Sequence, residues 1–272
     1  MKAKTLTSAL WSVWAIAALA PSTLAQEIEE DRRGAVAGQQ ADQFYDPVEM
    51  ARARDELRHS MGAQKTSMVL IDRFEAQSRN GADSLVLDGQ YWYGGDINKL
   101  WFKAEAEVNL ANGKFEDAEL QALWSRAISP FWDLQAGVRH DFEPDGLDHL
   151  VVGFQGLAPY WFEVDVASFV STDGDVTMRA EVEYDFLLTQ RLILQPRAEV
   201  GLSFQDIPER ETGAGFTSAD LGVRLRYEFK REFAPYIGWE WQRKLGQTAD
   251  LARAAGEPVN STAILAGLRV WF

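Results

Sequence analysis

Residues 100–110 have the sequence LWFKAEAEVNL, and this stretch decides the fold class. Every second position is apolar, from Leu100 to Leu110, while Lys103, Glu105 and Glu107 occupy positions between them. A helix with this sequence would carry charge on every side, whereas a β-strand separates the two classes onto opposite faces. The stretch therefore predicts a strand with one apolar and one charged face.

The same alternation recurs along most of the chain, notably over 160–166, 176–186, 192–204 and 219–230. It predicts about twelve strands, bounded by changes of period and by turn residues. They lie near 66–78, 84–93, 98–110, 115–128, 130–142, 147–157, 159–170, 175–187, 190–205, 217–230, 233–244 and 261–272.

Strand length distinguishes two architectures that both produce alternation. A soluble β-sandwich turns its apolar face inward, and strands of an ordinary sheet have about 5 to 6 residues. Most of these segments have 10 to 16 residues. A tilted strand needs about 9 to 11 residues to cross a bilayer. We therefore expect an all-β fold, a twelve-stranded antiparallel transmembrane β-barrel with a polar interior.

The connections and the C-terminus agree with a bacterial outer-membrane location. Connections after even-numbered strands are short, and the two longest, about 206–216 and 245–260, follow odd-numbered strands. Such barrels have short periplasmic turns and longer external loops. The last residues, LRVWF at 268–272, end in a phenylalanine on the apolar face and resemble the outer-membrane assembly signal.

Composition excludes several function classes. The 41 acidic and 27 basic residues give a net charge of −14, which disfavours a nucleic-acid partner because phosphate binding requires a basic face. The chain has no cysteine, which excludes disulfides, thiol catalysis and cysteine-ligated zinc. Past the N-terminus no run of about 18 apolar residues occurs, which excludes a helical membrane span.

The N-terminal region predicts export. Residues 1–25 have the features of a signal peptide, with Lys2 and Lys4 before the apolar stretch 6–19 and small residues before Gln26. Residues 26–65 are polar and predict a flexible periplasmic extension with at most a short helix, over 46–59. The barrel would then comprise residues 66–272.

Four stretches resemble the copper resistance protein B family of outer-membrane proteins. They are DGQYWYGGDINKLW at 88–101, QGLAPYWFEV at 155–164, LTQRLILQPR at 188–197 and REFAPYIGWEW at 231–241. The resemblance implies a role in copper tolerance, by binding copper at the outer membrane or passing it across. It implies copper as the cofactor, with copper ions and outer-membrane lipid as partners. A periplasmic copper protein is one candidate partner.

Candidate copper ligands are few. Copper(I) prefers thioethers and copper(II) prefers imidazoles. Members of the family often carry a Met- and His-rich segment before the barrel, whereas here only Met50, His59, Met61 and Met68 occur there. His59 and Met61, two positions apart, form one candidate pair; ordinary tail residues are the alternative.

The second candidate pair is His140 and His149, which flank the turn EPDG at 143–146. If Phe142 pairs with Leu147, His140 faces His149, and opposed residues have Cβ atoms about 4.5–5.5 Å apart. Two imidazoles so placed would share one divalent ion at the outer rim. A solvated loop pair is the alternative, and a slip of one residue in the turn would break the pairing.

By the alternation of each strand, the remaining charged side chains should point into the barrel interior, where opposite signs are interleaved. We therefore expect most of them to form ion pairs that fill the interior, and a minority to form an acidic path for cations. They are Lys103, Glu105, Glu107, Glu163, Asp165, Arg179, Glu181, Glu183, Asp185, Arg197, Glu199, Arg224, Arg226 and Glu228.

Three function classes compete: a copper-handling barrel, a general narrow channel or structural barrel, and a membrane-embedded hydrolase using His140, Asp141, Asp148 and His149. We expect no enzyme, because no Ser–His pair is suggested by spacing.

Overall fold

The computed structural model describes residues 41–42, 44–62, 64–79 and 82–272. The chain divides into two units, Met1–Gln64 and Lys65–Phe272. The predicted signal peptide and residues 26–40 of the predicted extension lie outside the described residues. No helix in the described part of the chain is long and apolar enough to cross a membrane.

The first unit contains helix α3, Pro47–Leu57, followed by a π-helical turn, η2, at Arg58–Gly62. Asp46 caps the helix, since its carboxylate accepts hydrogen bonds from the N–H groups of Val48 and Glu49 at 2.7 and 3.4 Å. Pro47 at the first helical position lacks an N–H that the helix would leave unpaired there. Arg54 donates two hydrogen bonds to Asp42, at 2.6 and 2.9 Å, which hold the pKa of that carboxyl below its ordinary value.

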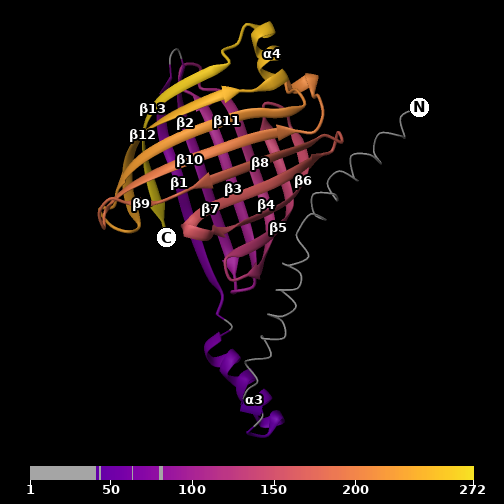
Figure 1. Cartoon of the computed structure of the whole chain (residues 1–272), viewed down its shortest axis with the longest axis vertical. Helices are drawn as coiled ribbons and strands as arrows, with labels where there is room; N and C mark the ends of the chain where they lie inside the picture. The colour runs from indigo at the N-terminus through magenta and orange to yellow at the C-terminus, as the bar shows by residue number, and fades with distance from the viewer. Residues whose placement is uncertain (1–40, 43, 63, 80–81) are drawn as a thin grey trace, which may run out of the picture. The chain divides into compact units, whose positions relative to one another are not determined.

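The second unit is an antiparallel β-barrel (Figure 1). Its strands are β1 Thr66–Arg79, β2 Ala82–Gly94, β3 Asn98–Asn109, β4 Phe115–Ser129, β5 Trp132–Glu143, β6 Leu147–Ala158, β7 Phe162–Ser171, β8 Val176–Glu183, β9 Phe186–Leu187, β10 Leu192–Ser203, β11 Gly215–Tyr227, β12 Phe233–Lys244 and β13 Asn260–Trp271.

The sheet closes because β13 pairs with β1. β8 and β9 pair in succession with the same neighbour, β10, and form one wall strand that is interrupted at residues 184–185. The wall therefore has 12 strands, which confirms the predicted fold class. The predicted strand at 159–170 begins only at Phe162, because Pro159–Trp161 forms a short 3-10 turn, η3.

Side chains alternate between the two sides of the wall as the sequence predicts. Leu150, Ile237 and Ile264 are more than half exposed on the outside, whereas Glu119 and Arg224 are buried inside. This is the reverse of a soluble sandwich, whose apolar faces would be covered. An apolar exterior around a polar lumen is the pattern of a transmembrane barrel.

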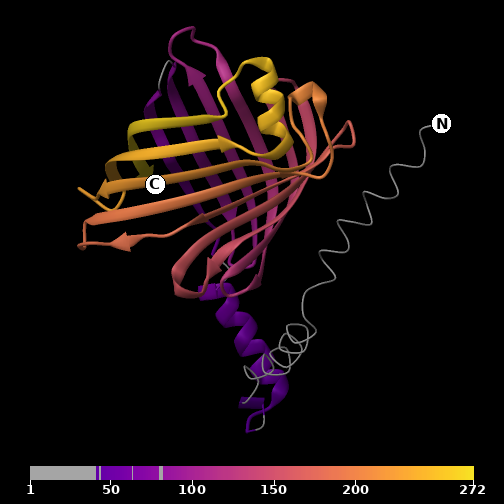
Figure 2. The ribbon, with the colours of Figure 1, turned by 45° about the horizontal axis from the view of Figure 1, so that its top comes forward.

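The connections differ in length between the two ends of the barrel. Short turns such as η3 join strands at one end, which we call the inner end. The two longest connections, 204–214 between β10 and β11 and 245–259 between β12 and β13, lie at the other, outer end. The second of these contains helix α4, Gly246–Ala255, which stands beyond the strand ends (Figures 1 and 2). Because longer loops face outward in such barrels, the inner end faces the periplasm.

Candidate functional site

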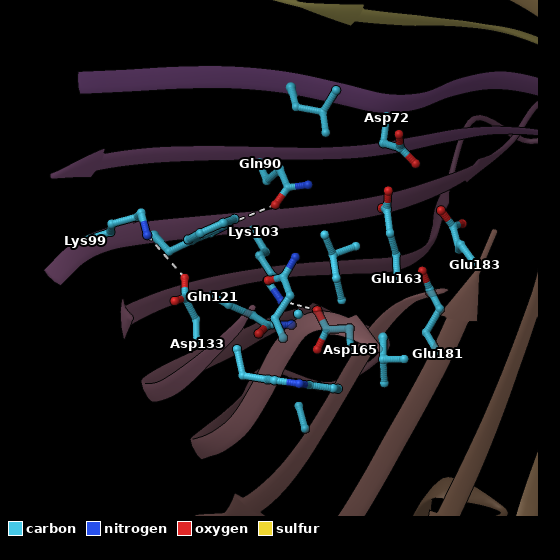
Figure 3. A pocket seen from close by; sticks show the side chains of 18 of the residues that line it. Asp72, Gln90, Lys99, Lys103, Gln121, Asp133, Glu163, Asp165, Glu181 and Glu183 are labelled. Carbon is cyan, nitrogen blue, oxygen red and sulfur yellow. Dashed lines mark hydrogen bonds and ion pairs between the residues drawn. The ribbon is translucent and has the colours of Figure 1, made fainter. Parts of the chain in front are cut away.

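The lumen contains a cavity of about 450 Å³ toward the inner end. Its wall carries nine carboxylates but only four cationic side chains, which leaves an excess of negative charge. Figure 3 shows Asp72, Glu163, Glu181 and Glu183 gathered on one side of this cavity. The carboxylates are Asp72, Asp88, Asp96, Glu105, Asp133, Glu163, Asp165, Glu181 and Glu183, and the cations are Lys99, Lys103, Arg179 and Arg269.

A β-bulge in β1 places one of these carboxylates. Ile71 pairs with Gly89 and Arg73 with Asp88, so Asp72 is an extra residue in the strand. A bulge interrupts the alternation of side chains. As a result, the side chains of two adjacent residues both point into the lumen. Asp72 lies 2.7 Å from Arg269, and Arg73 lies 2.7 Å from Asp88.

Two cationic side chains form ion pairs across the lumen. Lys103 on β3 is bonded to Asp165 on β7, and Arg179 on β8 lies 3.0 Å from both Glu105 on β3 and Glu119 on β4. These pairs confirm that Lys103, Asp165, Glu105 and Arg179 face inward. They connect strands that are not neighbours in the wall, so they fill the interior as well as neutralise it.

Other ion pairs lie against the inner surface of the wall and link strands that are close together in it. Arg224 bonds to Glu75 and Glu240, each at 2.9 Å, and the Tyr236 hydroxyl donates a 2.9 Å hydrogen bond to Glu75. Arg226 lies 2.6 Å from Asp185, in the interruption between β8 and β9. This agrees with the prediction that most lumen charges are ion-paired filling.

The predicted pairing of His140 with His149 is wrong. In the β5–β6 hairpin Asp141 pairs with Leu147, so His140 faces Asp148 and His149 faces Arg139. The turn is longer than predicted, and the register is shifted. Because neighbouring strand positions point to opposite faces, His149 lies inside the barrel and His140 outside. The two imidazoles therefore cannot share an ion.

His149 is a buried lumen residue, only 6% exposed. Its Nε2 lies 2.9 Å from Asp141 Oδ2, while its Nδ1 has no hydrogen-bond partner among the described residues. Asp141 is also bonded to Arg139, and Arg210 from the outer 204–214 connection approaches it to 3.6 Å. One buried carboxylate thus joins the imidazole, the wall and an outer loop.

The other predicted ligands lie apart. His140 is on the outer face, where its Nδ1 is 2.7 Å from Asp148 and its ring packs edge-on against Phe142. His59 and Met61 both lie in η2, and the Met61 side chain is exposed. Over residues 41–272, leaving aside the undescribed positions, no group of three His, Cys, Asp or Glu side chains is arranged to hold a metal.

The two longest connections contact each other at the outer end of the barrel. The Gly213 N–H donates a 3.0 Å hydrogen bond to Thr248 Oγ1 on α4. A Cβ atom at Gly213 would lie 2.4 Å from the Cβ of Gln247, so only glycine allows this approach. Together with Arg210, these contacts fasten the connections to each other and to the wall.

Sequence reasoning missed several lumen charges, among them Glu75, Glu119, Arg139 and Glu240. Each lies on the face opposite the exposed apolar residues of its strand, so strand parity would have found it. These strands carry glutamine, serine and glycine among their charges, which makes their alternation less regular than that of residues 100–110.

Comparison with known proteins gives the family. The family model described as "Copper resistance protein B precursor (CopB)" matches residues 65–272. The chain is 47% identical over 206 residues to "Copper resistance protein B" of Escherichia coli, covering 75% of this chain and 69% of that protein. It is 41% identical over 207 residues to "Copper resistance protein B homolog" of Pseudomonas syringae pv. tomato, covering 76% and 70%.

Among solved structures, the NanC porin superposes with a TM-score of 0.50 at 11% identity, covering 75% of this chain and 99% of that one. At this identity the likeness concerns the fold alone. The closed wall, the apolar exterior and the charged lumen are those of an outer-membrane barrel, and this is where the protein resides. On the match over its whole barrel, the chain belongs to the copper resistance protein B family.

Proposed function

We propose that the barrel contributes to copper resistance at the outer membrane by binding copper ions in its lumen and passing them across. Membership of the copper resistance protein B family is the observation that carries this proposal. The copper ion is then the cargo of the barrel and not a resident cofactor.

The inner cavity supports the cation part of the proposal. Its nine carboxylates outnumber its four cationic side chains. A cleft lined by one sign of charge with low-dielectric walls focuses the field and raises the local concentration of the opposite ion. Carboxylates prefer hard cations, however, so the cavity would collect divalent ions without selecting copper.

His149 supports the copper part. Imidazole suits copper, and a metal-binding histidine usually donates its other ring N–H to a carboxylate, which fixes its orientation. Asp141 Oδ2 is 2.9 Å from Nε2, and Nδ1 has no hydrogen-bond partner among the described residues. In the tautomer that donates Nε2–H to Asp141, Nδ1 carries the lone pair. We propose Nδ1 of His149 as a copper contact in the lumen.

The test compares His149→Gln with His140→Gln, because the two histidines lie in one hairpin on opposite faces. Copper is titrated into each refolded barrel, and each gene is returned to a copper-sensitive deletion strain. We expect His149→Gln to weaken binding and growth on copper, and His140→Gln to leave both at the wild-type level. Equal affinity in both variants would remove His149 from the proposal.

His59 and Met61 are tested in the same titration by a separate double replacement. Both are candidate ligands of the region before the barrel, and they lie within the five residues of η2. A loss of binding in this variant, with His149→Gln unchanged, would move the copper site out of the lumen.

A second candidate is a structural barrel or narrow channel without metal specificity. It is favoured because the described residues hold no cluster of three metal-binding side chains and because ion pairs fill the lumen. Wild-type copper tolerance in the deletion strain would favour it. In either case we propose a non-enzymatic role, since the hydrogen bond of His149 Nε2 goes to Asp141 and not to a hydroxyl.

A further inference from the structure

The lumen holds a second cavity, of about 140 Å³, on the outer side of the first. Its lining includes Arg79, Glu107 and Gln242, which lie at the outer ends of their strands. Two residues line both cavities, Glu105 and Arg179. Since these two form an ion pair at 3.0 Å, the pair is the partition between the cavities.

Arg179 is the centre of this partition. Its guanidinium lies 3.0 Å from Glu105, 3.0 Å from Glu119 and 3.6 Å from Glu199. The three carboxylates come from β3, β4 and β10. Along one side of the wall, four strands separate β3 from β8, which carries Arg179. The side chain therefore reaches across the interior.

Surrounding side chains hold the guanidinium in place. The guanidinium carbon of Arg179 lies 5.7 Å from the ring centroid of Phe169, which is on the lumen face of β7. The guanidinium carbon of Arg139 lies 4.7 Å from the same centroid. A guanidinium stacked on an aromatic ring and bonded to several carboxylates loses little further entropy in forming each bond. The partition is thus a preorganised part of the barrel.

We infer that Arg179 is the residue that closes the passage and sets its ion selectivity. The guanidinium neutralises Glu105 and adds a second cation beside Glu119 and Glu199, which Arg139 and Arg197 already contact. A cation moving between the cavities must compete with Arg179 for Glu105 and Glu119. Removing the guanidinium leaves Glu105 without its ion-pair partner, while Glu119 stays bonded to Arg139 and Glu199 to Arg197. A net gain of negative charge at this constriction favours cations, as rings of Asp or Glu do in channels. The inference rests on the proposed passage of cations through the lumen.

The experiment measures single-channel conductance and reversal potential in a KCl gradient, with wild type and Arg179→Gln in planar bilayers. We expect the variant to conduct several-fold more than wild type and to shift the reversal potential toward that of potassium. Arg179→Lys keeps the charge but loses the fork of donors, so we expect an intermediate conductance. Unchanged conductance and reversal potential in folded Arg179→Gln would overturn the inference.

Two arginine-to-glutamine controls distinguish an effect of the partition from the effect of losing any positive charge. Arg231 is exposed in the β11–β12 turn, and Arg226 is buried in the wall, where neither it nor its partners Asp185 and Gln195 line either cavity. Both should keep the wild-type conductance, and a rise in Arg226→Gln equal to that in Arg179→Gln would also refute the assignment. Heat-modifiable gel mobility reports folding of every variant.

Glu105→Gln provides an independent test if Arg179→Gln does not fold. It removes one crossing contact while Glu119 and Glu199 still hold the guanidinium. We expect a smaller rise in conductance than for Arg179→Gln, and no rise would count against the partition. Because the conductance is measured in KCl without copper, failure of this inference is distinguishable from failure of the copper proposal, which the growth and titration assays test.

Discussion

Arg224 on β11 donates hydrogen bonds to both carboxylate oxygens of Glu75 on β1, from Nε at 3.1 Å and from Nη2 at 2.9 Å. Two strands, β12 and β13, lie between them in the wall, so the pair ties the last hairpins to the first strand. Glu75 is 0% exposed and Arg224 is 3% exposed.

Breaking this pair should destabilise the barrel strongly. Glu75→Ala leaves the Arg224 cation buried without its main partner, and removing one member of a buried pair costs about 3–5 kcal/mol. The free energy of unfolding, measured by urea titration in lipid vesicles, checks this. Replacing the whole cluster together, Glu75→Leu with Arg224→Met and Glu240→Gln, should restore much of the loss, because none of its three charges remains unpaired.

The control is the exposed pair Lys244–Glu257, at 2.6 Å on the outer side. Exposed pairs contribute about 0–1 kcal/mol, so Glu257→Ala should have little effect. If Glu75→Ala and Glu257→Ala cost the same, the wall pair is not a stabilising element.

Gly213→Ala should detach the 204–214 connection from α4. The new methyl group would lie 2.4 Å from Gln247 Cβ and 2.8 Å from its Cγ, so the two segments must separate. Overpacking of this kind costs about 1–3 kcal/mol. We expect faster cleavage of the outer connections by protease added to whole cells. Gly146→Ala is the matched control, because nothing lies within 4 Å of its added Cβ, and it should be cleaved at the wild-type rate.

The contacts that join the outer connections to each other and to the wall predict slow access to the lumen from outside. Ser84 lies in the outer part of β2, is 2% exposed, and its hydroxyl has no partner among the described residues, so Ser84→Cys loses no hydrogen bond. The chain has no other cysteine. A membrane-impermeant thiol reagent added to cells should label Cys at position 84 slowly, and adding Arg210→Ala, which removes the contact with Asp141, should accelerate labelling.

Ala111→Cys, in the exposed turn after β3, is the reference for unhindered labelling. It should react quickly with or without Arg210→Ala. Equal rates at positions 84 and 111 in the wild-type background would show that the outer connections do not cover the lumen.

Period-two alternation predicted the architecture because the two faces of each strand meet different surroundings, lipid and an ionic lumen. It also predicted the inward direction of Lys103, Glu105 and Arg179. Parity within each strand also places His140 on the outer face with Val138 and Phe142, and His149 on the inner face. The predicted histidine pair failed because it relied on a four-residue turn, whereas Asp141 and not Phe142 pairs with Leu147. The bulge at Asp72 interrupts parity without a sequence signal. The partners of Arg179 depend on how the closed wall brings distant strands together, which no single strand encodes.

The β6–β7 turn contains two strained aromatic residues. Tyr160 and Trp161 have φ values of 69° and 70°, a left-handed conformation that costs a residue with a side chain about 1–2 kcal/mol. Glycine, and to a lesser extent asparagine, adopts a positive φ at little cost. Replacing the pair by Asn-Gly should therefore stabilise the isolated turn and speed hairpin formation.

The same replacement removes two exposed rings, including the edge-on contact of Trp161 with Phe131 at 6.4 Å between centroids. Aromatic side chains at the membrane interface anchor barrels. We expect the Asn-Gly variant to refold faster in detergent but to insert more slowly into vesicles, as followed by heat-modifiable gel mobility. If insertion is as fast as in wild type, the rings do not act as an interfacial anchor and the strain in this turn has no membrane role.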